Sequence, residues 1–516
     1  MTAKRRFHLA AARSRVKIVG HTQNMKTLAV ILLPMLSAAA DGPAGMDALL
    51  DAARAAPAEF AADASIRMAA LDQLEKTLRI ELLEQAFEKA SGAQQPYKRH
   101  ATFGRLSSSS GFLNRAYGLD LDGMSLRLRA IEGLLPLDAH KARELFLKTP
   151  PPKTPPVKCD DFLIYDVGRF YDTLGSIARQ SFTADEVQAG EPFRLLERYA
   201  GAITSPIEVA PVAQMLTTSN VKDADFRTLV NSFAGAMGKI SGDDRSFTYS
   251  MTAGKQILAL VEELKRRQLS PLPLIEAYRL YLVIHLSAAR CADDDSMLGT
   301  AVSFGLFTGR TVDQEAQDVI GFFNQRLRMA PLQPIAEEES TPSRLEGAAS
   351  GLRPCEGAEC RAIAEQHRGL VFGENGFPYT AEQKSTAAWR AKLRDFLAAL
   401  SRWQESAPGA SPTAAEQFRI KSEAYNDLLN LVSNSADREL VVRAMVDYLK
   451  QNRFQQENRM EWLLPVSALI GRMALDPLWT GRLGEELRKV DDPIIALYAN
   501  LEAAAPRPPA QIVPLL

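Results

Sequence analysis

Two short acidic runs are the part of the sequence best suited to chemistry. Each follows a basic residue and a cysteine, the first at Cys159 and the second at Cys291. A disulfide between these two cysteines would bring the carboxylates of both runs into one neighbourhood. These carboxylates belong to Asp160, Asp161, Asp293, Asp294 and Asp295.

Clustered carboxylates allow three interpretations. They are the ligands that calcium prefers, and a like-charged pair can also hold one raised pKa for acid–base catalysis. Aspartates of this kind more often cap or solvate helix ends. Neither run has the spacing of an EF-hand loop, so we favour helix capping and keep a calcium site at these residues as the alternative.

Other catalytic patterns are missing from the sequence. It contains no HExxH, GxSxG, GxxxxGK[ST] or GxGxxG signature. The histidines after residue 40 share no metal-ligand spacing, and they are His100, His140, His285 and His367. His285 lies in an apolar run, which predicts a hydrogen-bonded core histidine. We therefore predict no catalytic residue.

The four cysteines favour disulfides over free thiols or a metal site. Cys355 and Cys360 can close a short glycine-containing loop, which leaves Cys159 to pair with Cys291. This is one of three pairings that four cysteines allow. The sequence has no CxxC motif or Cys/His cluster that would indicate zinc.

An export signal accounts for the oxidising environment that disulfides need. Met25-Lys26 precedes an apolar core, and the small residues Ser37 to Ala40 form a cleavage point before Asp41. The uncharged stretch from Thr27 to Ala40 is shorter than the roughly 20 residues that cross a bilayer. We therefore predict a secreted or periplasmic protein, cleaved near Ala40, whose mature form has no transmembrane anchor.

The region before this signal is basic and has no acidic side chain. It is either an unusually long leader or a result of choosing a start codon upstream of Met25, and we favour Met25 as the true start. Residues 1–40 hold seven of the 61 basic side chains and none of the 62 acidic ones. The mature chain would thus carry a net charge of −8, which gives no electrostatic reason to bind nucleic acid.

The body of the chain has the period of an α-helix. Apolar residues recur three and four positions apart, as at Leu71, Leu74, Leu78 and Leu82, with charged residues between them. Alternation with period two is hard to find. We predict an all-α fold of stacked antiparallel helix pairs, an irregular α-solenoid or helical-repeat-like array, with little or no β-sheet. The residues Phe162, Tyr165, Phe170 and Tyr171 are expected in its core rather than in a ligand-binding wall.

Helix boundaries are legible where a capping residue stands beside a proline or a turn. Asp138, after Leu135 and Pro136, is expected to cap the second helix of a hairpin. Ser205, Ser270 and Asp492 each directly precede a proline and are expected at helix starts.

Two proline-rich breaks divide the predicted helices. Residues 149–156 must be extended because successive prolines fix φ. Residues 331–360 are rich in Pro, Gly, Ser and Glu, which is typical of a solvated linker. The predicted organisation is a leader and signal peptide (1–40), an N-terminal helical region (41–150), a central helical domain (157–330), a linker or long loop (331–362), a C-terminal helical domain (363–502) and a proline-rich tail (503–516).

These features favour an exported scaffold or binding module for a protein or a cell-envelope component. The alternative is an extracytoplasmic enzyme, a hydrolase or lyase acting on polysaccharide through the clustered aspartates. Such enzymes usually line a cleft with tryptophan, whereas here all four tryptophans lie after residue 380, far in sequence from the acidic runs. The scaffold is therefore the preferred expectation.

Overall fold

The computed structural model describes most of the chain between residues 42 and 504. The described residues are 42–93, 98–100, 120–157, 161–163, 165–242, 244, 246–247, 253–288, 312–340, 358–373, 377–403, 414–432, 434–451, 466, 469, 487–488, 490 and 492–504. The predicted signal peptide lies outside them.

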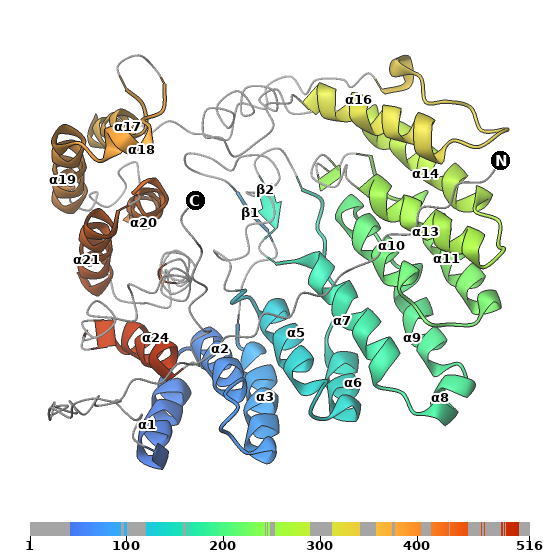
Figure 1. Cartoon of the computed structure of the whole chain (residues 1–516), viewed down its shortest axis with the longest axis horizontal. Coiled ribbons are helices and arrows are strands. Elements are labelled where there is room, and N and C mark those ends of the chain that lie inside the picture. The colour runs from blue at the N-terminus through green and yellow to red at the C-terminus, as the bar shows by residue number, and fades with distance from the viewer. Residues whose placement is uncertain are drawn as a thin grey trace, which may run out of the picture. The chain divides into compact units, whose positions relative to one another are not determined.

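The described residues are predominantly helical, and the predicted all-α fold is confirmed (Figure 1). The first helices are α1 (Gly42–Ala55), α2 (Ala58–Ala69), α3 (Lys76–Ala90), α5 (Gly123–Leu134), α6 (Ala139–Lys148), α7 (Val167–Gln180), α8 (Ala184–Gln188) and α9 (Glu191–Ala200). They are followed by η2 (Pro206–Glu208), α10 (Val209–Thr217), α11 (Asp223–Met237), α13 (Gly254–Arg266), α14 (Leu272–Leu286), α16 (Val312–Phe322), η4 (Phe323–Leu327) and η5 (Glu337–Ser340). The later helices are α17 (Ala358–Val371), α18 (Ala381–Lys384), α19 (Ala387–Arg402), α20 (Ala414–Leu431), α21 (Ser435–Gln451) and α24 (Pro493–Ala504).

The helices pack as a series of neighbours. Helix α3 contacts α2 and α5, helix α7 contacts α5, α6, α9 and α10, and α11 contacts α9 and α14. Farther along the chain, α19 packs against α17 and α21, and α20 against α21. The stacked helix pairs predicted from the period of the sequence are therefore present. None of the described helices is long and apolar enough to span a membrane.

A small antiparallel sheet is the one strand pairing between named strands in the described part of the chain. It pairs β1 (Lys98–His100) with β2 (Asp161–Leu163), and the register places His100 opposite Asp161. The expectation of little or no sheet is met.

Predicted helix starts are found where a side chain can satisfy free backbone N–H groups. Asp138 accepts a hydrogen bond from Lys141 N at 2.9 Å, which begins α6. Asp492 accepts from the amides of Ile494 and Ile495, both at 3.0 Å. Ser205 begins η2, where Glu208 accepts from its backbone N–H at 3.0 Å, and its hydroxyl also donates to the distant Asp244. Local chemistry thus sets most of these starts, and the capping residue of one also makes a tertiary contact.

An aromatic cluster joins α6, α7 and α9 in the core. The ring of Phe170 lies 5.2 Å from that of Phe146 and 5.4 Å from those of Tyr171 and Tyr199, measured between centroids. All four side chains are buried. The core assignment of Tyr165, Phe170 and Tyr171 is therefore confirmed, and the side chain of Phe162 lies outside the described set.

The two proline-rich breaks are anchored where the structure describes them. Thr154 donates to Glu208 at 3.2 Å, and Val157 N donates to Asp244 at 3.2 Å. In the second break, Asn324 binds Ile335 through both its amide nitrogen and its amide oxygen, at 3.0 and 2.9 Å. The first ten residues of the predicted linker thus attach to the preceding helices, and its last five begin α17. The remainder lies outside the described residues.

The N-cap residue of α5, Asp122, is buried in a place that disfavours its charged form. Asp122 accepts from the amides of Met124 and Ser125 at the start of α5, and it is only 4% exposed. Burial, reinforced by the nearby charge of Asp120, raises the pKa of Asp122 from 3.8 to about 6, although the cap hydrogen bonds oppose the shift. Because the folded state prefers the protonated form, this group stabilises the fold below pH 4 and that stability is lost as the pH rises through 6.

We predict that Asp122→Asn stabilises the protein at pH 7.5. Asparagine keeps the oxygen that caps α5 and removes the buried charge, so the free energy of unfolding should rise by about 1–3 kcal/mol. The gain should vanish near pH 4. Urea unfolding at both pH values measures this, with Asp138→Asn, a similar change at a half-buried cap, as the control. Equal destabilisation at both pH values would contradict the prediction.

Candidate functional site

The acidic runs predicted as a site fall almost entirely outside the described residues. Asp160 and Asp293–Asp295 lie outside them, and Asp161 is described only through its backbone in β2. Of the cysteines, Cys360 is buried in α17, while Cys159, Cys291 and Cys355 also lie outside. The convergence of the two runs and both disulfides therefore remain predictions.

A different acidic group gathers around Arg169, where α7 packs against α5. Arg169 binds Glu132 with two guanidinium nitrogens, at 3.1 and 2.9 Å, and Asp120 with a third at 2.7 Å. Asp166 caps the same helix by accepting from Gly168 N at 2.9 Å, and Asp172 lies one turn beyond Arg169. We call Asp120, Glu132, Asp166, Arg169 and Asp172 the Arg169 cluster.

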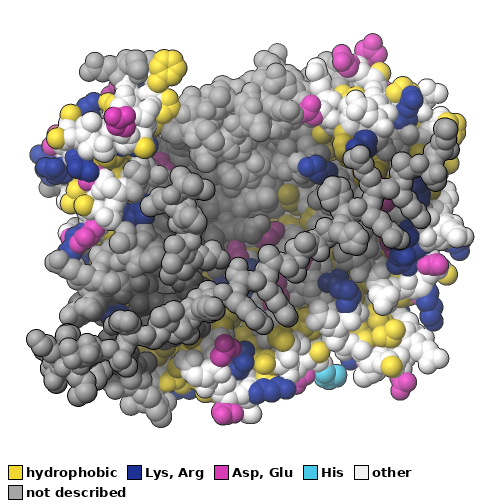
Figure 2. Space-filling model, viewed as in Figure 1, with side chains coloured by type: hydrophobic (Ala, Val, Ile, Leu, Met, Phe, Trp, Pro, Cys, Tyr) yellow, Lys and Arg dark blue, Asp and Glu magenta, His cyan; other side chains and the backbone are white. Residues whose placement is uncertain are grey.

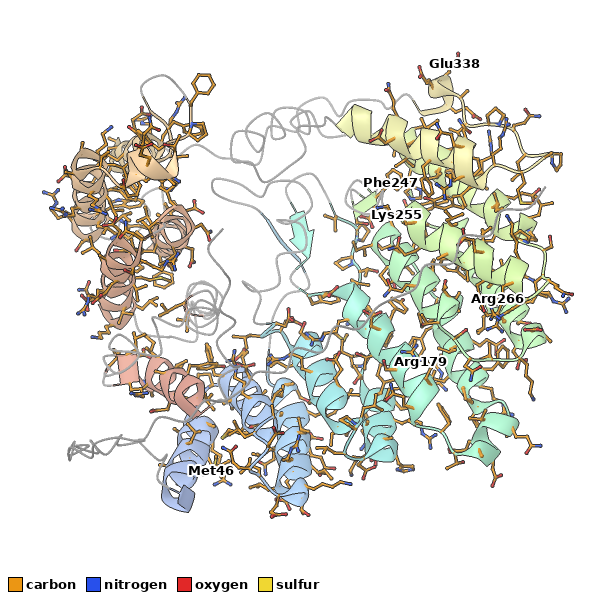
Figure 3. The ribbon with its side chains drawn as sticks, viewed as in Figure 1. Met46, Arg179, Phe247, Lys255, Arg266 and Glu338 are labelled. Carbon is orange, nitrogen blue, oxygen red and sulfur yellow. The ribbon has the colours of Figure 1, made fainter. Side chains whose placement is uncertain are left out.

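Negative charge exceeds positive charge within the Arg169 cluster, and the pKa values respond. Burial, together with the charges of Asp166 and Glu132, raises the pKa of Asp172. Burial alone would lower the pKa of Arg169, but Glu132 and Asp120 outweigh it and raise that pKa. Farther along α7, Arg179 opposes the shift of Asp172 (Figure 3).

Ion pairing is the interaction that the distances show within the Arg169 cluster. Arg169 occupies the centre at which a cation would bind, and among the described residues no group of three or more His, Cys, Asp or Glu side chains could hold a metal ion. Sequence reasoning missed this cluster because it searched for consecutive acids. The spacing of Asp166, Arg169 and Asp172 along one helix was the available signal.

A second polar group surrounds the buried carboxylates of Glu208 and Asp244. Glu208 accepts from Tyr171 Oη at 2.7 Å and from the backbone amides of Thr204 and Ser205 at 2.8 and 3.0 Å. Asp244 accepts from Ser205 Oγ at 2.8 Å and from Ser246 N at 2.9 Å. We call Glu208, Asp244 and these donors the Glu208–Asp244 network.

Ser205 and Asp244 of this network lie near His285, but the three residues do not form a catalytic triad. A triad requires the histidine to accept from the serine hydroxyl. Here Ser205 Oγ donates to Asp244, while the ring nitrogens of His285 face backbone carbonyl oxygens. All three residues are at most 5% exposed, which also denies access to a substrate. The arrangement is structural.

His285 is a hydrogen-bonded core histidine, as predicted. Its Nδ1 lies 2.8 Å from the carbonyl oxygen of Tyr281, and its Nε2 lies 3.0 Å from that of Ser241. A neutral imidazole has one N–H and can donate to only one of these oxygens at a time. Burial lowers the pKa of His285, although the two hydrogen bonds and the charge of Asp244 oppose the shift.

Comparison of the chain with protein-family models, with curated proteins and with solved structures finds no match in any of the three. Function is therefore inferred from the chain's own residues. In Figure 2, acidic and basic side chains are mixed over the described part of the visible face rather than gathered by sign.

We predict that His285 makes the fold sensitive to acid. Because its folded pKa is lowered, the neutral ring stabilises the fold above the ordinary pKa of 6.5, and this stability is lost as the pH falls. The variant His285→Gln cannot titrate, so it should lose less stability than the parent between pH 7.5 and 5.5. His140→Gln, at an exposed position of α6, is the control. Parallel pH profiles for the parent and His285→Gln would contradict the prediction.

Proposed function

We propose that the chain is an exported helical scaffold that binds another protein or a cell-envelope component. The observation that carries this proposal is the continuous packing of helices from α2 to α14, whose buried side chains belong to one hydrophobic core. Stacked helix pairs of this kind present extended surfaces, which repeat-like proteins use for binding. Fold alone does not fix function, so the site chemistry has to be weighed as well.

The polar chemistry of the described residues supports binding more than catalysis. The side chains of Ser205, Asp244 and His285 already form hydrogen bonds within the fold. In the Arg169 cluster, Arg169 already compensates Asp120 and Glu132. The proposal of export is supported by the sequence from Met25 to Ala40 alone, because these residues lie outside the described part of the chain.

An enzyme acting on polysaccharide is the second candidate, and one observation favours it. The pKa of Asp172 is raised while Glu132, bound to Arg169, lies on the neighbouring helix. A glycoside hydrolase uses a pair of carboxyl groups, one of them as the acid. If a glycan panel shows turnover that Asp172→Asn and Glu132→Gln each abolish, the enzyme replaces the scaffold.

We predict that export removes residues 1–40. When the full coding sequence is expressed in its own cells, the protein should be found outside the cytoplasm, and its intact mass should match a chain that begins at Asp41. A cytoplasmic protein that retains Met1 or Met25 would contradict export. A lipid or disulfide modification would change the mass by its own increment and is read from the same spectrum.

We also predict that binding depends on one part of the described surface. Leu147 on α6, Val187 on α8 and Leu280 on α14 are between 46% and 52% exposed, so lysine can replace each without disturbing the core. The mature chain carrying each substitution is used to capture cell-envelope components, which are quantified by mass spectrometry.

At least one of these three substitutions should reduce a captured component by roughly fivefold or more while the urea midpoint stays unchanged. The other two then serve as matched controls. If all three variants and the parent capture nothing, while a glycan panel shows turnover, the scaffold proposal fails.

A further inference from the structure

The last described helix packs on one of the first. Helix α24 contacts α2, and Tyr498 Oη donates a hydrogen bond of 2.6 Å to Asp63 Oδ2, 435 residues away in the sequence. The ring of Tyr498 meets that of Phe60 edge to face, with centroids 5.9 Å apart and planes at 84°. Tyr498, Asp63 and Phe60 are all fully buried. This contact joins two helices that are far apart in the sequence.

The buried carboxylate of Asp63 is held by two arginines as well as by Tyr498. Arg129 of α5 lies 2.5 Å from Oδ1, and Arg67 lies 2.9 Å from Oδ2. The guanidinium of Arg67 also lies over the ring of Tyr498, 5.2 Å from its centroid. Burial would raise the pKa of Asp63, but Arg129 and Arg67 outweigh it and lower that pKa. The acceptor is therefore ionised, which strengthens the hydrogen bond from Tyr498.

Helix α24 also depends on its neighbours for burial. Its sequence is apolar on several sides, and Ile494, Ile495, Leu497 and Leu501 are each at most 4% exposed. A helix of this kind is stable only when other elements cover it. In return, the loss of α24 would leave Phe60 and Asp63 of α2 uncovered, and an uncovered buried charge is costly.

We propose that α24 is a C-terminal clasp on α2, so that the two helices form one cooperative unit and open and close together. The clasp comprises α24, α2 and the contacts of Tyr498 with Asp63 and Phe60. It does not depend on the proposed scaffold function.

Hydrogen exchange of the unmodified full chain tests the clasp without any substitution. Exchange is followed by mass spectrometry in increasing, sub-denaturing urea. Peptides from residues 58–69 and 493–504 should open with the same free energy and the same urea dependence. Different urea dependences for α2 and α24 would overturn the proposal.

The variant Tyr498→Phe tests the hydrogen bond within the clasp. It keeps the packing on Phe60 and removes the hydroxyl that Asp63 accepts from, so exchange in both α2 and α24 should accelerate together by about tenfold or more. Tyr278→Phe removes the hydroxyl of a buried tyrosine in α14 and is the matched control, which should leave α2 and α24 unchanged. If exchange becomes faster in α24 while α2 is unchanged, α24 opens independently of α2, and this result would contradict the proposal.

Discussion

The hydrogen bonding of Glu208 is the interaction on which the middle of the structure depends. Its carboxylate is 3% exposed and accepts from Tyr171 of α7, from Thr154 in the proline-rich segment and from the turn before η2. Buried carboxyl oxygens need hydrogen-bond donors, and here donors from three separate segments supply them. The segment between α6 and α7 cannot form a helix, so its position relative to α10 depends on side-chain bonds of this kind. Asp244 fixes the same segment at Val157.

Three buried aspartates differ in the partners that surround their carboxyl groups. Asp63 is paired with two arginines, and its pKa is lowered. Asp244 is held by a serine hydroxyl and two backbone amides. Asp122 has only its cap hydrogen bonds to offset burial, and its pKa rises to about 6. For Asp63 and Asp122, which are both buried, the charge of the donors decides the direction in which the pKa moves.

Features set by neighbours in the sequence could be predicted, and features set by distant ones could not. Asp138 and Asp492 cap helices through amides two or three residues away, so their roles follow from local order. The helical period likewise determines the all-α fold. The bond between Tyr498 and Asp63 and the bridge between Arg169 and Asp120 depend on which helices pack together. A single sequence carries no signal for such pairs, and Ser205 shows both cases, because its place at the start of η2 was predictable and its hydroxyl bond to the distant Asp244 was not.

The distribution of polar groups bears on function as much as on stability. The side chains of Ser205, Asp244 and His285 are buried and are bonded to each other or to the backbone. A catalytic group needs access and a free coordination or proton-transfer partner, whereas a structural group needs neither. The partly exposed charges, as in the Arg169 cluster, lie on helix surfaces where partners can reach them. In the described residues, these inner polar groups hold helices together, while charges of both signs lie on the helix surfaces.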